Sequence, residues 1–566
     1  MSNTDFKEYE LPAPVYEEVA AEYARIGAAL DATASACGAI AAVEQWDALR
    51  RRLGSWSVLA YIRFQQDTRN EEYKRAREMR DELEPKLTNL AVGMKRKLVA
   101  SPHRQALVEH FGAHAFELWR CDIASFDPAI EGDLVEQAKL EASYTELLAS
   151  AKFEFQGKTQ TLEDMKALNS HQDRQVRHEA GQLRWGWFAT HQAQLDAIFD
   201  GLVTRRQAMA EKLGRDNFVS VGYERMQRVG YGQADVERFR VQVRDLVVPL
   251  AVNIRARQAE RLGIEQLMWW DESVQDSTGC PRPSGGHEWM TERASEMFAR
   301  VDPRLELFFA KMRARNAIDF ESREGKGGGG FCEVVPGFGL PFIFGSCTGT
   351  MIDAMLFTHE MGHAFQGYLG LEQPLWENIY PTMETCEIHS TALEFLTWPQ
   401  MDLFFGEDAE RFRQQHLLDR LLFLPYGAAV DHFQHSIYAN PKATPEERAA
   451  MWQELERTYL PWRTYGDLAH PASGRFWQGQ LHIYRYPFYY IDYALALTVA
   501  LQLWELAARD RPAAMEKFFE LCRRGGELAF GELVRSVGLI SPFEDGCLER
   551  VVARAQHSET RKLKES

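Results

Sequence analysis

The stretch DAMLFTHEMGHAFQGYL, residues 353–369, contains the pattern H-E-x-x-H in a run of helix-forming residues. On a helix, His359 and His363 are one turn apart and share a face, so both imidazoles can reach one ion. Glu360 lies beside that face, where a carboxylate can accept a proton from an attacking water. The pattern predicts a metal site on a helix. The alternative is a surface helix on which His and Glu have this spacing by coincidence.

A catalytic zinc site needs a third protein ligand and keeps one coordination position open. The segment PTMETCEIHSTALEFLTW, 381–398, is rich in acids and is predicted to be a helix, with proline at its start and just after its end. Glu384 and Glu387 are three residues apart and share a face, so spacing does not decide between them. Ser390 and Thr391 lie one turn beyond Glu387 and are expected to orient it. The candidate ligands on this helix are Glu384, Glu387, His389 and Glu394.

A third segment, LHIYRYPFYYIDYALA at 481–496, concentrates tyrosines around one histidine. Hydrolysis of a peptide at zinc develops an oxyanion, which phenol or imidazole donors stabilise. If the segment is helical, Tyr490 and Tyr493 are three residues apart and point the same way. The alternative is an aromatic patch in the core. The candidate donors are His482, Tyr486, Tyr489, Tyr490 and Tyr493.

The composition limits the classes of partner. The formal net charge is -17, and a surface this acidic repels phosphate backbones and anionic membranes, so neither nucleic acid nor membrane is an expected partner. The eight cysteines are scattered and form no CxxC pair, which suits a reducing compartment. The first residues are acidic and contain no apolar stretch typical of a secretory signal. These features predict a cytoplasmic protein.

With 566 residues the chain is expected to form two or more lobes. Most of it has helical periodicity, and Pro85 is expected to kink or break one of the helices. Strand signals outweigh helix signals only at 324–350, among glycines. The apolar stretch 486–504 contains Asp492 and is predicted to be a buried helix rather than a membrane span. The clearest helical patterns are at 71–98, 131–151, 174–213 and 234–262, and 276–289 is a predicted loop.

Taken together, these segments resemble the thimet oligopeptidase family of zinc peptidases, and most closely its oligoendopeptidase F and Pz-peptidase branch. The resemblance is strongest from about 325 to 500. A weaker similarity, such as DNFVSVGYERM at 216–226, extends it over most of the chain, and the first 200 residues match only as a helical lobe. The segments that carry it are GGGGFCEVVPGFGLPFIF, THEMGHAFQ, YPTMETCEIHSTALEFLTWP and YRYPFYYIDYALA.

The resemblance implies a role for each residue of the motif. His359 and His363 are implied zinc ligands and Glu360 the general base. In the family the third ligand is followed seven residues later by another glutamate, and Glu387 with Glu394 fits that register. The resemblance therefore implies Glu387 as the third ligand.

The same resemblance implies residues that bind the substrate. The strand PFIFGS resembles the edge strand beside the motif helix, to which extended peptides add by backbone pairing. His482, Tyr490 and Tyr493 match positions that contact the scissile carbonyl and the substrate, and the choice of oxyanion donor stays open among the four tyrosines. The implied substrate-binding residues are Phe342, Ile343, Phe344, Gly345, Tyr486 and Tyr489.

The sequence thus predicts a mainly α, two-lobed, zincin-like body that encloses a deep channel, with a small β-sheet next to the H-E-x-x-H helix. The expected division is a helical lobe at 1–200 and a catalytic domain at 201–566. The expected function is a zinc endopeptidase, with one Zn²⁺ per chain, that cuts short unstructured peptides as a monomer or homodimer. Cobalt or manganese could occupy the same ligands. The alternatives are a C-terminal exopeptidase, with Arg485 as a candidate for holding the terminal carboxylate, and a non-catalytic peptide-binding protein.

Overall fold

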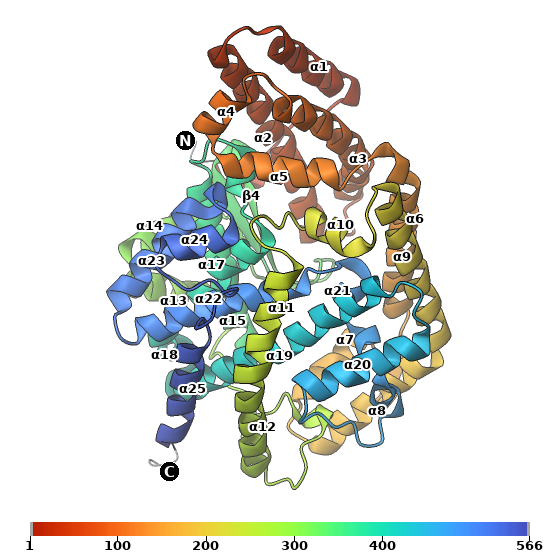
Figure 1. Cartoon of the computed structure of the whole chain (residues 1–566). Coiled ribbons are helices and arrows are strands. Elements are labelled where there is room, and N and C mark those ends of the chain that lie inside the picture. Colours follow the sequence, from red (N-terminus) through yellow and green to blue (C-terminus); the bar gives the residue numbers. More distant parts are fainter. Residues whose placement is uncertain (1–3, 563–566) are drawn as a thin grey trace. The chain divides into compact units, whose positions relative to one another are not determined.

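The computed structural model describes residues 4–562, which are mainly helical and include two small β-sheets (Figure 1). The chain forms two compact units, and neither is a continuous segment. The mainly α fold predicted from the sequence is confirmed. The expected boundary at residue 200 lies inside unit 2. Unit 1 combines the described part of Met1–Ile123 with Pro281–Glu410 and Val499–Ser541, and unit 2 combines Ala124–Cys280, Arg411–Thr498 and the described part of Pro542–Ser566.

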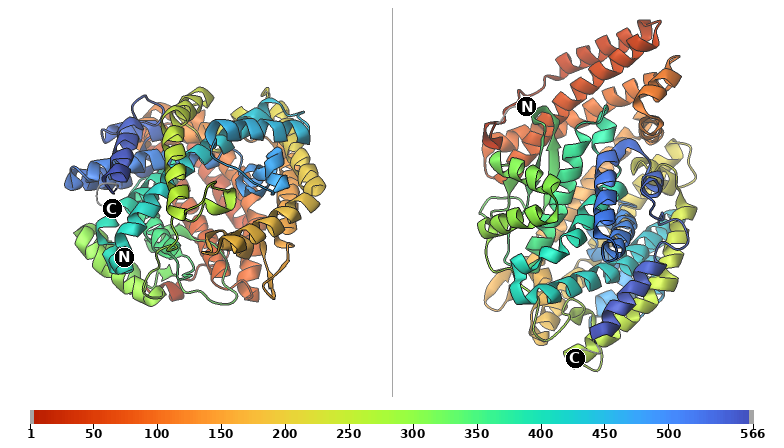
Figure 2. Two further views of the ribbon diagram at one scale, coloured as in Figure 1. Left: turned by 90° about the horizontal axis from the view of Figure 1, so that it is seen from below. Right: turned by 90° about the vertical axis from the view of Figure 1, so that its left-hand side faces the viewer.

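Unit 1 begins with long helices that pack side by side, as Figure 2 shows for the segments drawn in red and orange. Trp46 and Trp119 have no exposed surface, and their rings meet edge to face with centroids 5.8 Å apart. Pro85 lies inside α3, which continues through it as a single helix. The helices are α1 (Tyr16–Ala32), α2 (Ala36–Gln66), α3 (Glu71–Val99), α4 (Arg104–Phe111) and α5 (Ala113–Ala124).

The rest of unit 1 contains a three-stranded sheet and the helices around it. Its strands are β3 (Ile318–Asp319), β4 (Phe331–Val335) and β5 (Leu340–Phe344), in the spatial order β3-β5-β4. Strand β5 runs parallel to β3 and antiparallel to β4. The helices are α13 (His287–Val301), α14 (Pro303–Ala314), α15 (Met351–Gly370), α16 (Trp376–Ile379), α17 (Met383–Leu396), α18 (Asp402–Phe405), α23 (Arg511–Arg524) and α24 (Phe530–Ser536).

A buried lysine fixes the glycine-rich segment to this sheet. The Lys326 ammonium donates to the Asp319 carboxylate at 2.8 Å and to the main-chain carbonyls of Asp319, Glu321 and Gly345. Its side chain is only 1% exposed, and the carboxylate compensates its charge there. The four glycines that follow therefore begin at an anchored residue, Lys326, and lead directly into β4.

Unit 2 is also helical, with one β-hairpin that was not predicted from the sequence. Strands β1 (Phe153–Phe155) and β2 (Lys158–Gln160) pair antiparallel across Gln156 and Gly157, both at positive φ, which suits a two-residue hairpin turn. The helices are α6 (Glu131–Ala149), α7 (Leu162–Ala167), α8 (Arg174–Thr190), α9 (Gln192–Lys212), α10 (Phe218–Arg225), α11 (Gln233–Gln242), α12 (Val248–Leu262), α19 (Ala409–Ala439), α20 (Pro445–Tyr459), α21 (Leu481–Arg485) and α25 (Glu549–Lys562).

Helix α22 (Tyr490–Ala507) begins in unit 2 and ends in unit 1. It contains most of the apolar stretch 486–504, and Asp492 near its start is fully buried. Across residues 4–562 no helix is long and apolar enough to cross a bilayer. The prediction of a buried helix is confirmed for 490–504, whereas 486–489 precede the helix and Tyr486 is exposed.

Candidate active site

The helix with the H-E-x-x-H motif, α15, starts at a carboxylate cap. Asp353 is 1% exposed and accepts hydrogen bonds from the main-chain N–H groups of Thr348, Gly349 and Thr350. The cap satisfies donors that a helix start leaves without partners, and its negative charge favours the positive end of the helix dipole. It fixes the first turn of α15, so the positions of the histidines two turns later are defined.

The two histidines and Glu387 converge on one point. Their ligand atoms all lie within 4.8 Å of one another. Glu387 Oε2 is 3.3 Å from His359 Nε2 and 3.6 Å from His363 Nε2. Burial lowers the pKa of His359, but the carboxylates of Glu387 and Glu394 outweigh burial and raise that pKa to about 10. Two imidazoles and one carboxylate that face a common point form the donor set of a catalytic zinc site, so the residues fit the predicted ion.

Glu394 orients the first of these ligands. Its carboxylate accepts a hydrogen bond from His359 Nδ1 at 2.7 Å, so His359 Nε2 is the nitrogen directed at the common point. A carboxylate behind a metal-binding histidine fixes the tautomer and the ring orientation. Spacing alone predicted Glu394 only as one of several candidate ligands. Glu394 lies seven residues after Glu387, two turns along the same face of α17. This spacing lets Glu387 face the common point while Glu394 orients His359.

Replacing Glu394 by glutamine is expected to lower the affinity for zinc by about 10–100-fold, because the amide holds the His359 ring less firmly and leaves it less basic. Competition with a chromogenic chelator measures this affinity. The exposed Glu407→Gln is the matched control and should bind zinc as the wild type does. Unchanged zinc affinity in Glu394→Gln would show that this carboxylate does not support the site.

Gly362, between the two histidines, lets α15 and α17 pack in direct backbone contact. A Cβ at this position would come within 2.4 Å of the His389 carbonyl oxygen and 2.6 Å of the Ser390 Cα. Real side chains do not approach a backbone this closely, so one helix would have to move. The glycine therefore sets the helix separation at which Glu387 reaches the histidines.

Gly362→Ala is expected to push α17 away from α15, to destabilise the fold by about 1–3 kcal/mol and to weaken zinc binding. Gly93→Ala is the control, because this glycine lies inside α3 and a Cβ there meets nothing within 4 Å. The control should be neutral or slightly stabilising. Thermal unfolding and zinc titration of both variants test the contact, and equal behaviour of the two would contradict it.

Glu360 lies on the same helix but outside the ligand group. It is 4% exposed, its Oε2 has no hydrogen-bond partner within the described part of the chain, and burial raises the pKa of its carboxyl. A buried carboxylate oxygen without a donor is costly unless a further group is meant to meet it. The position suits a base that accepts a proton from a water at the ligand group.

Among the other candidates on α17, Glu384 and His389 are buried but lie outside the ligand group found in residues 4–562. Burial lowers the pKa of His389 to about 4. Ser390 Oγ donates to Glu387 Oε2 at 3.1 Å, as predicted from spacing. The choice of Glu387 over Glu384, which the resemblance had implied, therefore agrees with the geometry.

The sheet corrects one prediction about the substrate-binding strand. Phe342, Ile343 and Phe344 belong to β5, which is the central strand, and all three are fully buried. Gly345 extends the pairing by donating its N–H to the Asp319 carbonyl at 2.9 Å. The prediction that this segment is an edge strand is wrong, because β3 and β4 take its hydrogen-bonding groups on both sides. A strand that is apolar at every position is typical of a sheet interior.

The edge beside α15 is β4 instead. Val334 lies opposite Pro341, which has no N–H. The Val334 carbonyl accepts a hydrogen bond from the Tyr380 hydroxyl at 2.8 Å. This carbonyl therefore points away from β5. By the alternation of a strand, the backbone of Cys332 points to the same outer side. In the part of the sheet described, β4 is thus the strand of the β4–β5 pair with an outer edge.

The predicted tyrosine cluster forms within unit 2. The His482 ring lies 4.9 Å from Tyr490, 5.8 Å from Tyr489, 5.9 Å from Tyr486 and 6.0 Å from Tyr493, between ring centroids. Burial lowers the pKa of His482 to about 4 and raises the pKa of Tyr490 well above its ordinary value. His482 is therefore neutral and the Tyr490 phenol protonated, the forms in which each can donate a hydrogen bond.

Comparison with protein-family models agrees with this geometry. Residues 6–126 match the peptidase M3 N-terminal domain, and residues 304–552 match peptidase family M3. The chain belongs to peptidase family M3. The second match contains the whole ligand group and the tyrosine cluster of this M3 peptidase.

Solved structures extend the match to 98% of the chain. Pz peptidase A, solved with an inhibitor, is 40% identical, with a TM-score of 0.92 over 98% of this chain and 99% of that chain. A putative oligoendopeptidase F has the same identity and TM-score over 98% of both chains. A putative oligoendopeptidase F from Bacillus anthracis is 36% identical, with a TM-score of 0.87 and the same coverage. The search of curated proteins gave no match. The M3 peptidase is thus a metallopeptidase of the oligoendopeptidase F branch.

Proposed function

We propose that this M3 peptidase is a zinc endopeptidase that hydrolyses internal bonds of short, unstructured peptides. The observation that carries the proposal is the convergence of His359, His363 and Glu387 beside a buried Glu360. Zinc bound there would supply Lewis-acid chemistry, lowering the pKa of a water and polarising a carbonyl. One ion per chain is expected, because the described residues contain one such ligand group.

The remaining steps belong to the protein. Glu360 accepts the proton of the attacking water and delivers it to the leaving amine, so one carboxylate serves both half-reactions. His482 and either Tyr490 or Tyr493 donate hydrogen bonds to the oxyanion, an assignment that rests on the family resemblance. The peptide is held in extended form along the outer edge of β4, whose Cys332 backbone supplies an N–H and a carbonyl for pairing.

Digestion of a mixed peptide library, analysed by mass spectrometry with and without a chelator, tests the proposal. Internal cleavages that stop with chelator and return with added zinc are expected. A peptide blocked at both termini separates this activity from the exopeptidase alternative, because an exopeptidase leaves such a peptide intact. Cleavage that persists after complete metal removal, or release only from free C-termini, would contradict the proposal.

A further inference from the structure

The turn between α21 and α22 has an unusual backbone. Phe488 is fully buried and has a φ of 68°, a left-handed conformation that aromatic residues rarely adopt. Such a conformation persists only where its surroundings enforce it, and it is typical of functional sites. Glycine would adopt it without strain, so the aromatic ring must be needed at this position.

Both main-chain groups of Phe488 are held by buried side chains. Its N–H donates to Gln434 Oε1 at 2.8 Å, and its carbonyl accepts from the Arg228 guanidinium. The same guanidinium nitrogen donates to Asp492 Oδ1 at 2.9 Å, and the side chains of this ion pair have no exposed surface. Arg228 therefore ties the turn to the first turn of α22.

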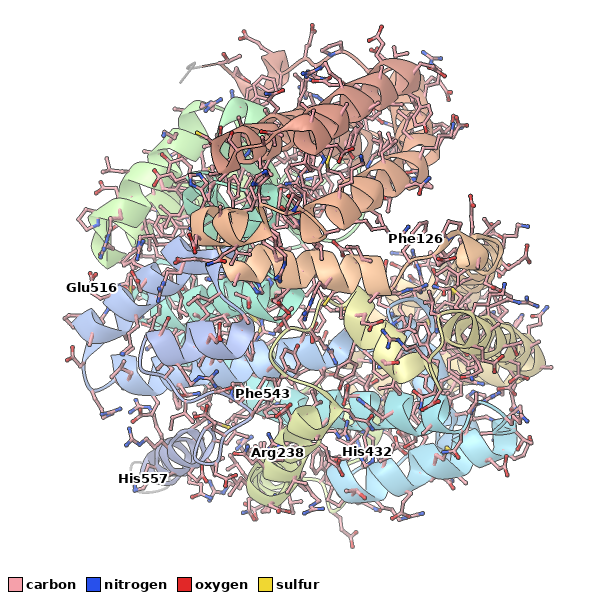
Figure 3. The ribbon with its side chains drawn as sticks, turned by 45° about the horizontal axis from the view of Figure 1, so that its top comes forward. Phe126, Arg238, His432, Glu516, Phe543 and His557 are labelled. Carbon is pink, nitrogen blue, oxygen red and sulfur yellow. The ribbon has the colours of Figure 1, made fainter. Side chains whose placement is uncertain are left out.

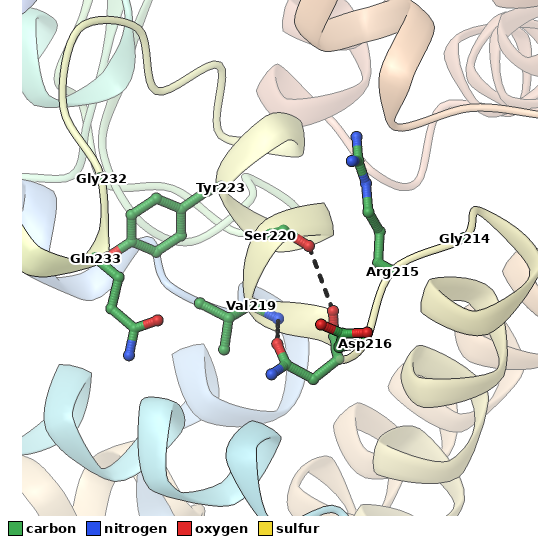
Figure 4. Close-up of a pocket in the computed structure, with 9 residues that line it drawn as sticks. Gly214, Arg215, Asp216, Val219, Ser220, Tyr223, Gly232 and Gln233 are labelled. Atoms are coloured by element: carbon green, nitrogen blue, oxygen red, sulfur yellow. Dashed lines mark hydrogen bonds between the residues drawn. The ribbon is translucent and has the colours of Figure 1, made fainter.

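The ring of Phe488 is enclosed as tightly as its backbone. A Cβ on Gly222 would lie 2.4 Å from a ring carbon, so the ring rests directly on the backbone of α10. Its centroid is 4.9 Å from that of His435 and 5.6 Å from that of Tyr223, whose hydroxyl is 3.0 Å from His435 Nε2. Tyr223 also lines a cavity of about 560 Å³ on α10 (Figure 4). Helix α10 thus provides a fixed wall for the ring.

A second ion pair holds His435 in place. Arg240, on α11, binds Asp431 on α19, and both side chains are buried. His435 Nδ1 lies 3.1 Å from the Arg240 guanidinium and 3.2 Å from Asp431 Oδ2. Figure 3 labels Arg238 and His432, which lie on these two helices. The support of Phe488 therefore extends through α10, α11 and α19 of unit 2.

This turn decides where the tyrosines point. The Tyr489 carbonyl accepts from the Asp492 N–H at 2.9 Å and so opens α22, which begins at Tyr490. Along the chain, Tyr486 precedes Phe488, and the other three tyrosines follow it. A change in φ at Phe488 would therefore rotate Tyr490 and Tyr493 relative to His482 on α21.

We infer that Arg228 and Phe488 are positioning residues, which hold the tyrosine cluster in the arrangement that binds the reacting carbonyl. The inference rests on the proposed role of that cluster. It also gives a function to the segment 216–226, where Gly222 supplies the wall and Arg228 follows closely after. A buried ion pair alone adds little stability compared with apolar residues of the same size. This ion pair has a second role, because its guanidinium also holds the carbonyl of Phe488, whose backbone φ is left-handed.

The test replaces the ion pair with Arg228→Met/Asp492→Asn, which leaves no unpaired buried charge. We expect kcat to fall at least ~10-fold while KM changes less than about threefold, because misplaced donors weaken transition-state binding and not substrate binding. The Ki of a phosphinic peptide, which mimics the tetrahedral state, should rise by the same factor as kcat falls. Arg228→Lys is the second variant, which keeps the test decisive if the double variant fails to fold. It keeps the positive charge but loses the forked guanidinium donors, so kcat should again fall while KM changes little.

The matched control is Arg177→Met/Asp271→Asn. Arg177 is also buried and also joins an aspartate to a main-chain carbonyl, that of Trp270. This control should lose stability but keep kcat per folded molecule. Equal effects of the two double variants on kcat, or a wild-type kcat in both Arg228 variants, would overturn the inference.

Three further variants separate this inference from the proposed function. His482→Phe, Tyr490→Phe and Tyr493→Phe remove the donors themselves. If all three keep the wild-type kcat, the cluster has no role in the reaction, and the inference is overturned with it. If any of them lowers kcat while neither Arg228→Lys nor Arg228→Met/Asp492→Asn does, the proposed function stands and the positioning role of Arg228 is rejected.

Discussion

Glu360→Gln is expected to lower kcat by about 10²–10⁴-fold, the range of general acid–base catalysis, which corresponds to ~3–5 kcal/mol in the barrier. The substitution keeps the size and most of the polarity of the side chain. It removes the only group in the proposed mechanism that accepts and returns a proton. Because Glu360 lies outside the ligand group, zinc binding should be retained.

The measurement combines steady-state hydrolysis of a fluorogenic peptide with metal analysis of the same sample. KM should change little, because a buried carboxylate at 4% exposure contributes little to holding the peptide. Glu372→Gln is the control, since Glu372 is exposed just after the end of α15. Turnover within about threefold of wild type in fully metallated Glu360→Gln would reject Glu360 as the base.

Short-range spacing predicted the parts of this site that lie on one helix. His359, Glu360 and His363 occupy consecutive turns of α15, and helical periodicity fixes their relative positions. The third ligand comes from α17, and spacing left Glu384 and Glu387 equivalent. The choice depends on how α15 and α17 pack, which the close contact at Gly362 determines.

The position of one strand within the sheet was predicted incorrectly from the sequence. The segment LPFIF was expected at an edge, yet every residue of it is buried. A strand that is apolar at each position indicates a sheet interior, whereas FCEVV carries Glu333 and is less buried. The pattern was present in the sequence, but the resemblance placed at an edge a strand that is central in the sheet.

The left-handed turn at Phe488 could not have been predicted from sequence. Positive φ is usually signalled by glycine or asparagine, and the local sequence YPFYY contains neither. The conformation is enforced by Arg228, Gly222 and Gln434, which lie 260, 266 and 54 residues away along the chain. Contacts at that separation appear only in the folded protein.

Glu387→Gln is expected to weaken zinc binding by at least about 100-fold, more than the loss of a residue that only orients a ligand. Burial raises the pKa of the Glu387 carboxyl, but the two histidines outweigh burial and hold it well below its ordinary value. The carboxylate is therefore charged, and it is the only negative ligand in the group. Glutamine keeps an oxygen in place but removes the charge that attracts a divalent cation.

Glu384→Gln is a closely matched control for this variant. Glu384 lies one turn earlier on the same helix, is 1% exposed and is also a glutamate, but its carboxylate is not part of the ligand group. Zinc content after gel filtration and the increase in Tm on adding zinc should be near wild type in Glu384→Gln and strongly reduced in Glu387→Gln. The opposite result would make Glu384 the third ligand, and equal zinc binding in both variants would show that neither carboxylate holds the ion. Because the two residues differ mainly in their position relative to His359 and His363, a difference between the variants would be an effect of geometry rather than of burial or charge.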